Sequence, residues 1–283
     1  MKKALLVLLC LAAGFFGATV AVRTYTPGIS HESAYDRVMR TGTLRCGYFL
    51  WPKFVDKDPN TGALSGIAFD VAESVAQKFG LKVEWTEVAI GSEVEALQTT
   101  KVDAICAANG PFNWKSAAYE DFVTPFAKFR IDVYGRANET RFKIPADLNS
   151  PDVTFSALDG DLSTVYAVES FPQAKMLSLP NMADPSLLVL NVIDNKADVV
   201  LVDPVTVSMT EAQYPGAIKP LFARPYGFIP TGMSVGKNQH ALLQMLNQGM
   251  EILFDVGIMD KILDKYDPER KLAVRRDAPE WEQ

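Results

Sequence analysis

Histidine, the side chain most often used for acid–base chemistry and metal binding, occurs twice in the 283 residues, as His31 and His240. The two histidines are far apart in the sequence and neither belongs to a motif. A histidine metal site or a Ser-His-Asp triad is therefore not expected. We find no other metal or cofactor motif, so the sequence predicts no metal, no cofactor and no catalytic residue.

The charge balance of the chain indicates which kind of binding partner is not expected. The chain has 28 Lys plus Arg against 34 Asp plus Glu, a formal charge of −6. No long basic run is present, which argues against a dedicated nucleic-acid binder. Hydrophobic residues make up 48% of the chain, enough to form a folded core. The length suits one large domain or two lobes.

The first residues have the pattern of a targeting segment. Lys2 and Lys3 precede an uncharged run over residues 4–22. A basic start followed by an apolar stretch is typical of a signal peptide, with cleavage expected after Ala21. The alternative is an uncleaved membrane anchor, because the run is just long enough to cross a bilayer. Either way, the rest of the chain is expected to be exported.

The chain has three cysteines, and Cys10 lies in the targeting segment. The other two, Cys46 and Cys106, would be exported with the rest of the chain. An oxidising compartment permits a disulfide between them. Both fall in segments predicted as core strands, where two buried thiols would behave as small hydrophobic side chains. We favour two free buried thiols over the disulfide.

Strand and helix patterns alternate over residues 32–107. Strands are indicated at 44–49, 81–88 and 102–107. A helix capped by Ser65 has apolar residues at i, i+4 spacing and ends at Gly80. Ser92 and Glu95 form a capping-box pattern for a second, short helix. Strands that alternate with helices indicate a parallel sheet.

A second α/β group is indicated over residues 140–215. Its strands are expected at 153–157, 175–179 and 197–202, and its helices at 162–171 and 184–195. Asp203 followed by Pro204 predicts one more helix start. Residues 239–267 form a helical tail, and extended links near 124–134 and 224–230 join the two groups. Two lobes joined by two strands indicate a hinged clamshell, whose ligand binds between the carboxyl ends of the strands.

Five short motifs occur in a fixed order along the chain. They are TLRCG at 43–47, GALSGIAFD at 62–70, LQTTKVD at 97–103, DFVTP at 121–125, and NKAD at 195–198 followed by Asp203. Together they resemble the type II periplasmic solute-binding proteins of the polar amino-acid ABC transporter class, the family 3 extracellular solute-binding proteins. The resemblance spans about residues 33–267 and implies an α/β, two-lobed clamshell with two hinge strands, preceded by a signal segment.

The resemblance also implies domain limits. Residues 1–21 would be the signal peptide or an uncleaved anchor. Residues 24–127 and 226–283 would form the first lobe, and residues 128–225 the second. The hinges would lie near 124–130 and 223–229.

In this family the ligand lies between the lobes, so positions can be carried over. Trp51 would pack on the ligand, residues 108–110 would supply backbone hydrogen bonds, and Asp203 would bind an ammonium group. The family's carboxylate-binding arginine is replaced by Lys115 or Ser116, depending on the direction of counting, or by Arg224 near the second hinge. The candidate ligand-binding residues are Phe49, Trp51, Ala108, Gly110, Trp114, Lys115, Asp161, Asp203 and Tyr226.

These departures affect which ligand is expected. Arginine holds a carboxylate with two parallel donors, whereas lysine offers a point charge. Asp161 stands where the family has a threonine and would repel a carboxylate. Aromatic faces beside an acidic residue suit ammonium groups; the aromatic candidates are Phe49, Trp51, Phe54, Phe112, Trp114 and Tyr226. A cation or a neutral polar solute is therefore favoured over a standard α-amino acid.

Structural roles stay open for the same residues. Trp51 and Trp114 could instead pack against the rest of the protein, and Lys115 could be an ordinary solvent-exposed lysine. Asp161 and Asp203 could serve only as helix caps.

The resemblance implies a function. The chain would be an exported, periplasmic, monomeric binding protein that captures a small polar solute, an amino acid or a related amine, and delivers it to an ABC-type permease without catalysis. One alternative is an enzyme similar to the periplasmic dehydratases of prephenate-like compounds, with Asp161 or Asp203 as general acid. Another is a ligand-sensing ectodomain held by an uncleaved anchor.

Overall fold

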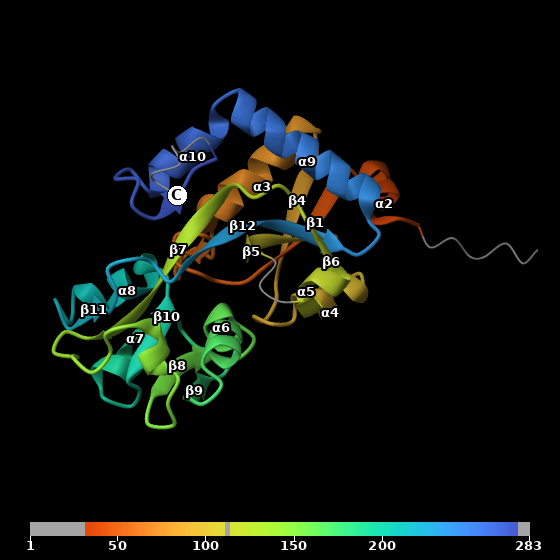
Figure 1. Ribbon diagram of the computed structural model, residues 1–283. Helices are drawn as coiled ribbons and strands as arrows, with labels where there is room; N and C mark the ends of the chain where they lie inside the picture. Colours follow the sequence, from red (N-terminus) through yellow and green to blue (C-terminus); the bar gives the residue numbers. More distant parts are fainter. Residues whose placement is uncertain (1–31, 111–113, 277–283) are drawn as a thin grey trace, which may run out of the picture. The chain divides into compact units, whose positions relative to one another are not determined.

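The computed structural model describes residues 32–110 and 114–276, apart from the side chains of residues 114, 115, 162 and 163 (Figure 1). The predicted signal segment at 1–21 and the aromatic candidate Phe112 lie outside these ranges. All the elements below belong to the unit Ala34–Gln283. Within the described ranges, no helix combines the length and apolar character that a membrane crossing requires.

A first α/β group, made of the elements from α2 to β6 together with α9 and α10, has a parallel sheet. Its strands are β1 (Thr43–Tyr48), β4 (Lys82–Glu87) and β5 (Ala104–Asn109), in the order β4-β1-β5. Its early helices are α2 (Ala34–Thr41), α3 (Ile67–Lys78), α4 (Glu93–Gln98) and α5 (Trp114–Tyr119). Of the four apolar residues predicted for α3, Ile67, Val71 and Val75 are fully buried, and Phe79, which follows the last helical residue, is partly buried.

A second α/β group comprises the elements from η1 to β11. Its parallel strands are β8 (Thr154–Leu158), β9 (Lys175–Leu179) and β10 (Val199–Val202). Its helices are η1 (Pro145–Leu148), α6 (Leu162–Ser170), α7 (Ser186–Ile193) and α8 (Pro204–Glu211). The helix predicted after Asp203 is confirmed, because the Asp203 Oδ1 accepts hydrogen bonds from the N–H groups of Val205 and Thr206 at 2.8 and 3.0 Å.

Two long antiparallel strands connect these groups (Figure 1): β7 (Ala127–Arg136) and β12 (Gly227–Gly236). β12 pairs with β5 and β7 pairs with β10, which gives the strand order β4-β1-β5-β12-β7-β10-β8-β9. The remaining short strands are β2 (Asp56–Lys57), β3 (Leu64–Ser65), β6 (Glu120–Phe122), β11 (Ile218–Pro220) and β13 (Ala273–Val274). The extended links predicted near 124–134 and 224–230 thus correspond to β7 and β12, and the α/β fold class is confirmed.

The helical tail divides into α9 (His240–Asp255) and α10 (Ile258–Tyr266), which both pack against α3. The predicted apolar positions of α9, Leu242, Leu246, Met250 and Leu253, are fully buried. The tail is not one helix, because Gly257 between the two has a φ of 68°.

Two predicted helix caps are wrong. Ser65 pairs with Asp56 as part of β3, so α3 begins at Ile67 after Gly66. Ser92 precedes α4 with a ψ of 10°, and its side chain makes no capping hydrogen bond. A capping side chain needs an extended backbone to reach the N–H groups of the first turn. The capping-box interpretation of Ser92 and Glu95 therefore fails.

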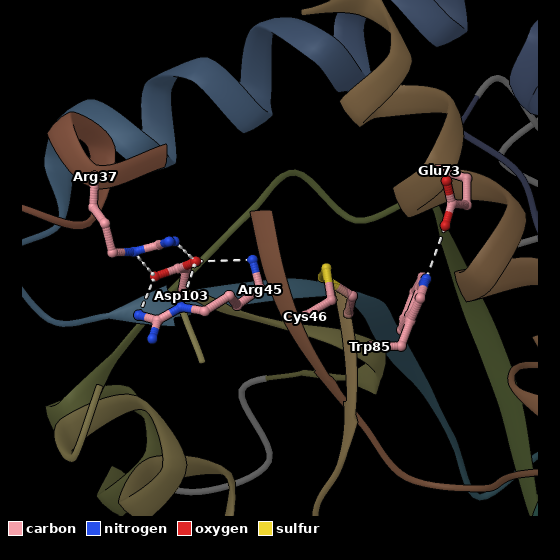
Figure 2. The surroundings of a disulfide bond; sticks show 7 residues. Arg37, Arg45, Cys46, Glu73, Trp85 and Asp103 are labelled. Atoms are coloured by element: carbon pink, nitrogen blue, oxygen red, sulfur yellow. Dashed lines mark hydrogen bonds and ion pairs between the residues drawn. A yellow bond between two sulfur atoms is a disulfide. The ribbon is translucent and has the colours of Figure 1, made fainter. Parts of the chain in front are cut away.

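The preference for two free thiols is also wrong, since Cys46 and Cys106 form a disulfide (Figure 2). Cys46 in β1 is paired with Ala104 in β5, so the parallel register brings Cys106 close, with a Cα–Cα distance of 5.4 Å. Both residues have no exposed surface. The bond ties the two central strands of the first group together.

An ion-pair cluster around one buried carboxylate lies beside the disulfide (Figure 2). Asp103, which precedes β5 and is 3% exposed, accepts hydrogen bonds from the guanidinium groups of Arg37 and Arg45. It also accepts one from the backbone N–H of Arg45, at 2.8 Å. The cluster joins α2, β1 and the start of β5.

Candidate functional site

A cavity of about 490 Å³ is lined by residues of both α/β groups and of the two long strands. This volume is in the usual range for small-molecule sites. The first group contributes Phe49, Trp51, Phe54, Ile90, Gly91, Glu93, Val94, Ala108, Asn109, Ser116, Tyr119 and Glu120. The long strands contribute Phe129, Ile131, Ile229 and Thr231, and the second group Gly160, Asp161, Val165 and Asp203.

The cavity lies where strands end, as the parallel topology predicts. Phe49 directly follows β1, and Ala108 and Asn109 end β5. Asp203 directly follows β10, and Asp161 follows β8 by three residues. Residues more than 100 positions apart thus line one space.

Trp51 and Asp203 join the two groups at this cavity. The indole Nε1 of Trp51 donates a hydrogen bond to the Asp203 Oδ2 at 2.9 Å. The hydroxyl of Thr206 donates to the same oxygen at 2.8 Å, while Oδ1 caps α8. The carboxylate of Asp203 is therefore satisfied by protein donors, and helix capping is an established role of this residue.

A second contact between the groups is made by backbone alone. A Cβ atom placed on Gly160 would lie 2.8 Å from the Cα of Gly91, which is shorter than the distance at which two non-bonded carbon atoms can lie. Gly91 and Gly160 also have φ values of 83° and 82°, which glycine adopts without a steric penalty. Nearby, the Asn181 amide donates a hydrogen bond to the carbonyl of Ile90 at 3.1 Å. The two loops can meet this closely only because both positions are glycine.

The electrostatic character of the cavity is acidic. Four carboxyl groups line it, those of Glu93, Glu120, Asp161 and Asp203. Among the lining residues that the structure describes, none is Lys, Arg or His. Phe49, Trp51, Phe54, Phe129 and Tyr119 add aromatic surface, and Phe54 and Phe129 pack edge to face at 4.5 Å.

Burial changes the acidity of two of these groups. It raises the pKa of Glu93 to about 7, and the negative charges of Glu120 and Asp161 act in the same direction. Burial also raises the pKa of Glu120. The hydrogen bonds that the Glu120 Oε2 accepts from Ser234 at 2.5 Å and from Asn109 at 2.9 Å oppose that shift. Hydrogen bonds from the backbone N–H groups of Glu93 and Gly91 likewise oppose the shift of Glu93.

Five of the nine residues predicted from sequence line the cavity: Phe49, Trp51, Ala108, Asp161 and Asp203. So does Ser116, one of the positions weighed for the missing arginine. Gly110 is buried, and its N–H donates to the Asn109 Oδ1 at 2.9 Å. Trp114 and Lys115 belong to α5, but their side chains lie outside the described residues.

Tyr226 and Arg224 are placed elsewhere. Both line a separate pocket of about 460 Å³ together with Lys143 and Pro145. The Tyr226 ring packs against Phe171, and its hydroxyl donates to the Ser170 Oγ at 2.6 Å. Neither residue is in the lining of the first cavity.

Sequence reasoning missed Glu93 and Glu120. The apparent capping box drew attention to Glu95, which is exposed. A usable signal was present, because Glu93 follows the predicted strand at 81–88 by only a few residues. Ligands of parallel sheets bind beyond the carboxyl ends of the strands, and Glu93 lies beyond such an end.

An α/β fold whose two groups supply walls to one cavity defines the class of two-lobed, type II solute-binding proteins. Residues 50–269 match the model of the bacterial extracellular solute-binding proteins, family 3, and the chain belongs to that family. The family resemblance predicted from the five motifs is thus confirmed.

Individual relatives agree with this assignment. A probable histidine-binding protein of Campylobacter jejuni is 22% identical over 207 residues, which are 73% of this chain and 78% of the relative. The crystal structure of an ancestral amino acid-binding protein, described as a precursor of cyclohexadienyl dehydratase, is 26% identical. It matches with a TM-score of 0.71 over 83% of this chain and 99% of its own. The cysteine-binding protein of Campylobacter jejuni is 19% identical and shares the fold, with a TM-score of 0.73 over 86% of this chain and 99% of its own.

Proposed function

We propose that this protein is an exported binding protein that captures a small polar solute in the cavity and delivers it to an ABC-type permease. The observation that carries the proposal is the cavity itself, which is lined by both α/β groups and bounded by the contact between Trp51 and Asp203. The probable histidine-binding relative and the ancestral amino acid-binding protein support an amino acid or a related amine as the ligand class. The periplasm is the expected location.

The proposed mechanism is closure about the two long strands. Residues 24–127 and 226–283 would move as one lobe and residues 128–225 as the other, with hinges near 124–130 and 223–229. The pairing of β7 with β12 supports this division, since they are the long strands that link the groups. A ligand that contacts both walls favours the closed form over the open one. The permease would then recognise the closed form.

We further propose Phe49, Trp51, Ala108 and Asp161 as ligand contacts. Phe49 and Trp51 present aromatic surface at the end of β1, and Ala108 presents backbone at the end of β5. Asp161 faces them from the second group. Asp203 would act mainly by holding Trp51, because its oxygens already accept four hydrogen bonds.

One observation favours a second candidate, an enzyme. With a pKa of about 7, Glu93 is partly protonated at neutral pH inside the cavity, as a general acid must be. An ancestral neighbour described as the precursor of a dehydratase points in the same direction. Incubation of the protein with candidate substrates and mass analysis of the mixture separates the two: a binding protein returns its ligand unchanged.

The proposal is tested by a thermal-shift screen of the purified protein with amino acids, amines, organic acids and small sugars. A ligand at one hundred times its dissociation constant adds about 2.7 kcal/mol of stability, which is readily measured. We expect a shift with at least one nitrogen-containing solute, which is recovered unchanged. No shift across the panel, or conversion of the solute, would contradict the proposal.

A further inference from the structure

We propose that the captured solute is an organic cation without a carboxylate group, a diamine or an amine with a guanidinium or imidazole end, and that Glu93 binds its cationic group. This inference rests on the proposed function and deepens it. It makes Glu93, which no sequence motif singled out, the residue that determines specificity.

The first support is the sign of the charges around the cavity. Glu93, Glu120, Asp161 and Asp203 all line it, and the described lining residues include no basic side chain. The side chain of Lys115 lies outside the described residues, but one lysine would offset only one of the four carboxyl groups. A carboxylate that entered this space would be repelled, and the repulsion is strongest in a cavity closed from water.

The second support is the distribution of hydrogen bonds among the acids. Asp203 accepts four, from Trp51, Val205 and the N–H and hydroxyl of Thr206. The Oε2 of Glu120 accepts two, from Asn109 and Ser234. These two carboxylates are already stabilised by protein donors, so a ligand cation would add less to their stability.

Glu93 differs from them. Its carboxylate accepts hydrogen bonds from two backbone N–H groups, that of Gly91 at 3.0 Å and its own, and Glu120 and Asp161 place like charges nearby. Burial raises the pKa of Glu93 to about 7 despite the backbone hydrogen bonds that it accepts, so its ionised form is disfavoured in the cavity. An ammonium or guanidinium group supplied by a ligand would provide the missing counter-charge.

The third support is the apolar surface that lines the same cavity as the acids. Phe49, Trp51 and Phe54 line the cavity together with Ile131 and Ile229. The alkyl stem of an amine packs on such surface, and an aromatic face also attracts a cation. The combination of carboxyl groups and apolar surface in one cavity suits a short alkyl amine.

The test compares three pairs that differ only in the α-carboxylate: agmatine with arginine, cadaverine with lysine, and histamine with histidine. Affinities are measured by isothermal titration calorimetry near neutral pH. We expect the decarboxylated member of at least one pair to bind about tenfold or more tighter than its amino acid. If, in every pair that binds, the amino acid binds as tightly as its amine, or tighter, the inference is overturned while the proposed function stays intact.

The role of Glu93 is tested with a matched pair of variants on α4. Glu93→Gln removes the charge inside the cavity, and Glu95→Gln removes an exposed charge two residues away. We expect Glu93→Gln to weaken amine binding about tenfold or more and Glu95→Gln to leave it unchanged. Unfolding midpoints of both variants establish that they are folded. Equal affinities for the folded Glu93→Gln variant and the wild type would overturn the assignment, whereas no binding by any solute would refute the proposed function instead.

Discussion

The indole Nε1 of Trp51 donates a hydrogen bond to the Oδ2 of Asp203, 152 residues further along the chain, at 2.9 Å and out of contact with solvent. Trp51 belongs to the loop after β1, and Asp203 caps α8. One side chain thus caps the start of a helix of the second group and holds an aromatic residue of the first. The start of α8 and the contact between the two groups at the cavity involve the same carboxylate.

Trp51→Phe is expected to weaken ligand binding about tenfold and to lower the free energy of unfolding by roughly 1–2 kcal/mol. The phenyl ring keeps most of the apolar packing but removes the donor, which leaves the buried Asp203 Oδ2 with the hydroxyl of Thr206. Calorimetric titration and urea denaturation measure the two effects.

Trp85→Phe is the matched control, because the indole of Trp85 donates to the Glu73 Oε1 at 2.8 Å within the first α/β group (Figure 2). It removes an equivalent hydrogen bond that does not join the two groups. We expect a modest loss of stability and no change in affinity. Equal affinities for both variants would show that the contact between Trp51 and Asp203 has no role in binding.

Gly160→Ala is expected to reduce affinity by obstructing the contact between the two groups. The new Cβ would lie 2.8 Å from the Cα of Gly91. Gly216→Ala is the control, because Gly216 has a φ of 65° but no atom within 4 Å of an added Cβ. Both substitutions strain the backbone by about 1 kcal/mol, but only Gly160→Ala should weaken binding, by about tenfold. Similar affinities for the two variants would argue against a closed form that needs this contact.

The pH dependence of stability is expected to report the state of Glu93. Its pKa in the folded protein is raised to about 7 from 4.5, so the folded state retains a proton that the unfolded chain loses. The resulting stabilisation is present at low pH and is lost as the pH rises through about 7.

Glu93→Gln removes this dependence. Relative to the wild type, the variant should therefore gain stability between about pH 5 and about pH 8, by at most about 3 kcal/mol. Urea denaturation at both pH values gives the comparison, and Glu95→Gln serves as the control. A constant difference between Glu93→Gln and the wild type would mean that Glu93 is ionised at both pH values.

Removal of the disulfide is expected to lower stability without changing ligand affinity. Cys46 and Cys106 are separated by 60 residues, and the bond lies in the sheet of the first group. The chain-entropy estimate for such a loop is about 4 kcal/mol. Alanine is the substitution of choice at both positions, because a buried serine would add an unsatisfied hydroxyl. An unchanged unfolding midpoint in the double variant would show that the bond does not restrict the unfolded chain.

The sequence predicted the parts of the fold that depend on local patterns. The apolar spacing of Ile67, Val71 and Val75 places α3, and Asp203 before Pro204 marks the start of α8. Short strands such as β6 and β13 were not predicted, because they form only by pairing with β12 and β7. The disulfide depends on the register of β1 against β5, which no local pattern contains.

Only part of the candidate site was predicted, because some of its features depend on contacts between distant segments of the chain. Ala108 and Asp161 were carried over from the family resemblance, and Phe49 was an aromatic candidate in a predicted cleft loop. All three follow strand ends, as the rule for ligands of parallel sheets expects. Tyr226 precedes β12, but its ring packs within the second group, away from the cavity. The raised pKa of Glu93 depends on burial and on charges from distant segments. Neither feature can be derived from the neighbouring residues alone.

The most direct test of the proposed function is a calorimetric titration of wild-type protein and the Trp51→Phe variant with the solute that gives the largest thermal shift. We expect one-to-one binding by the wild type with a dissociation constant in the micromolar range or below, and about tenfold weaker binding by the variant. Absence of binding of any panel solute to the wild type, or unchanged affinity of Trp51→Phe for the same solute, would contradict the proposed function.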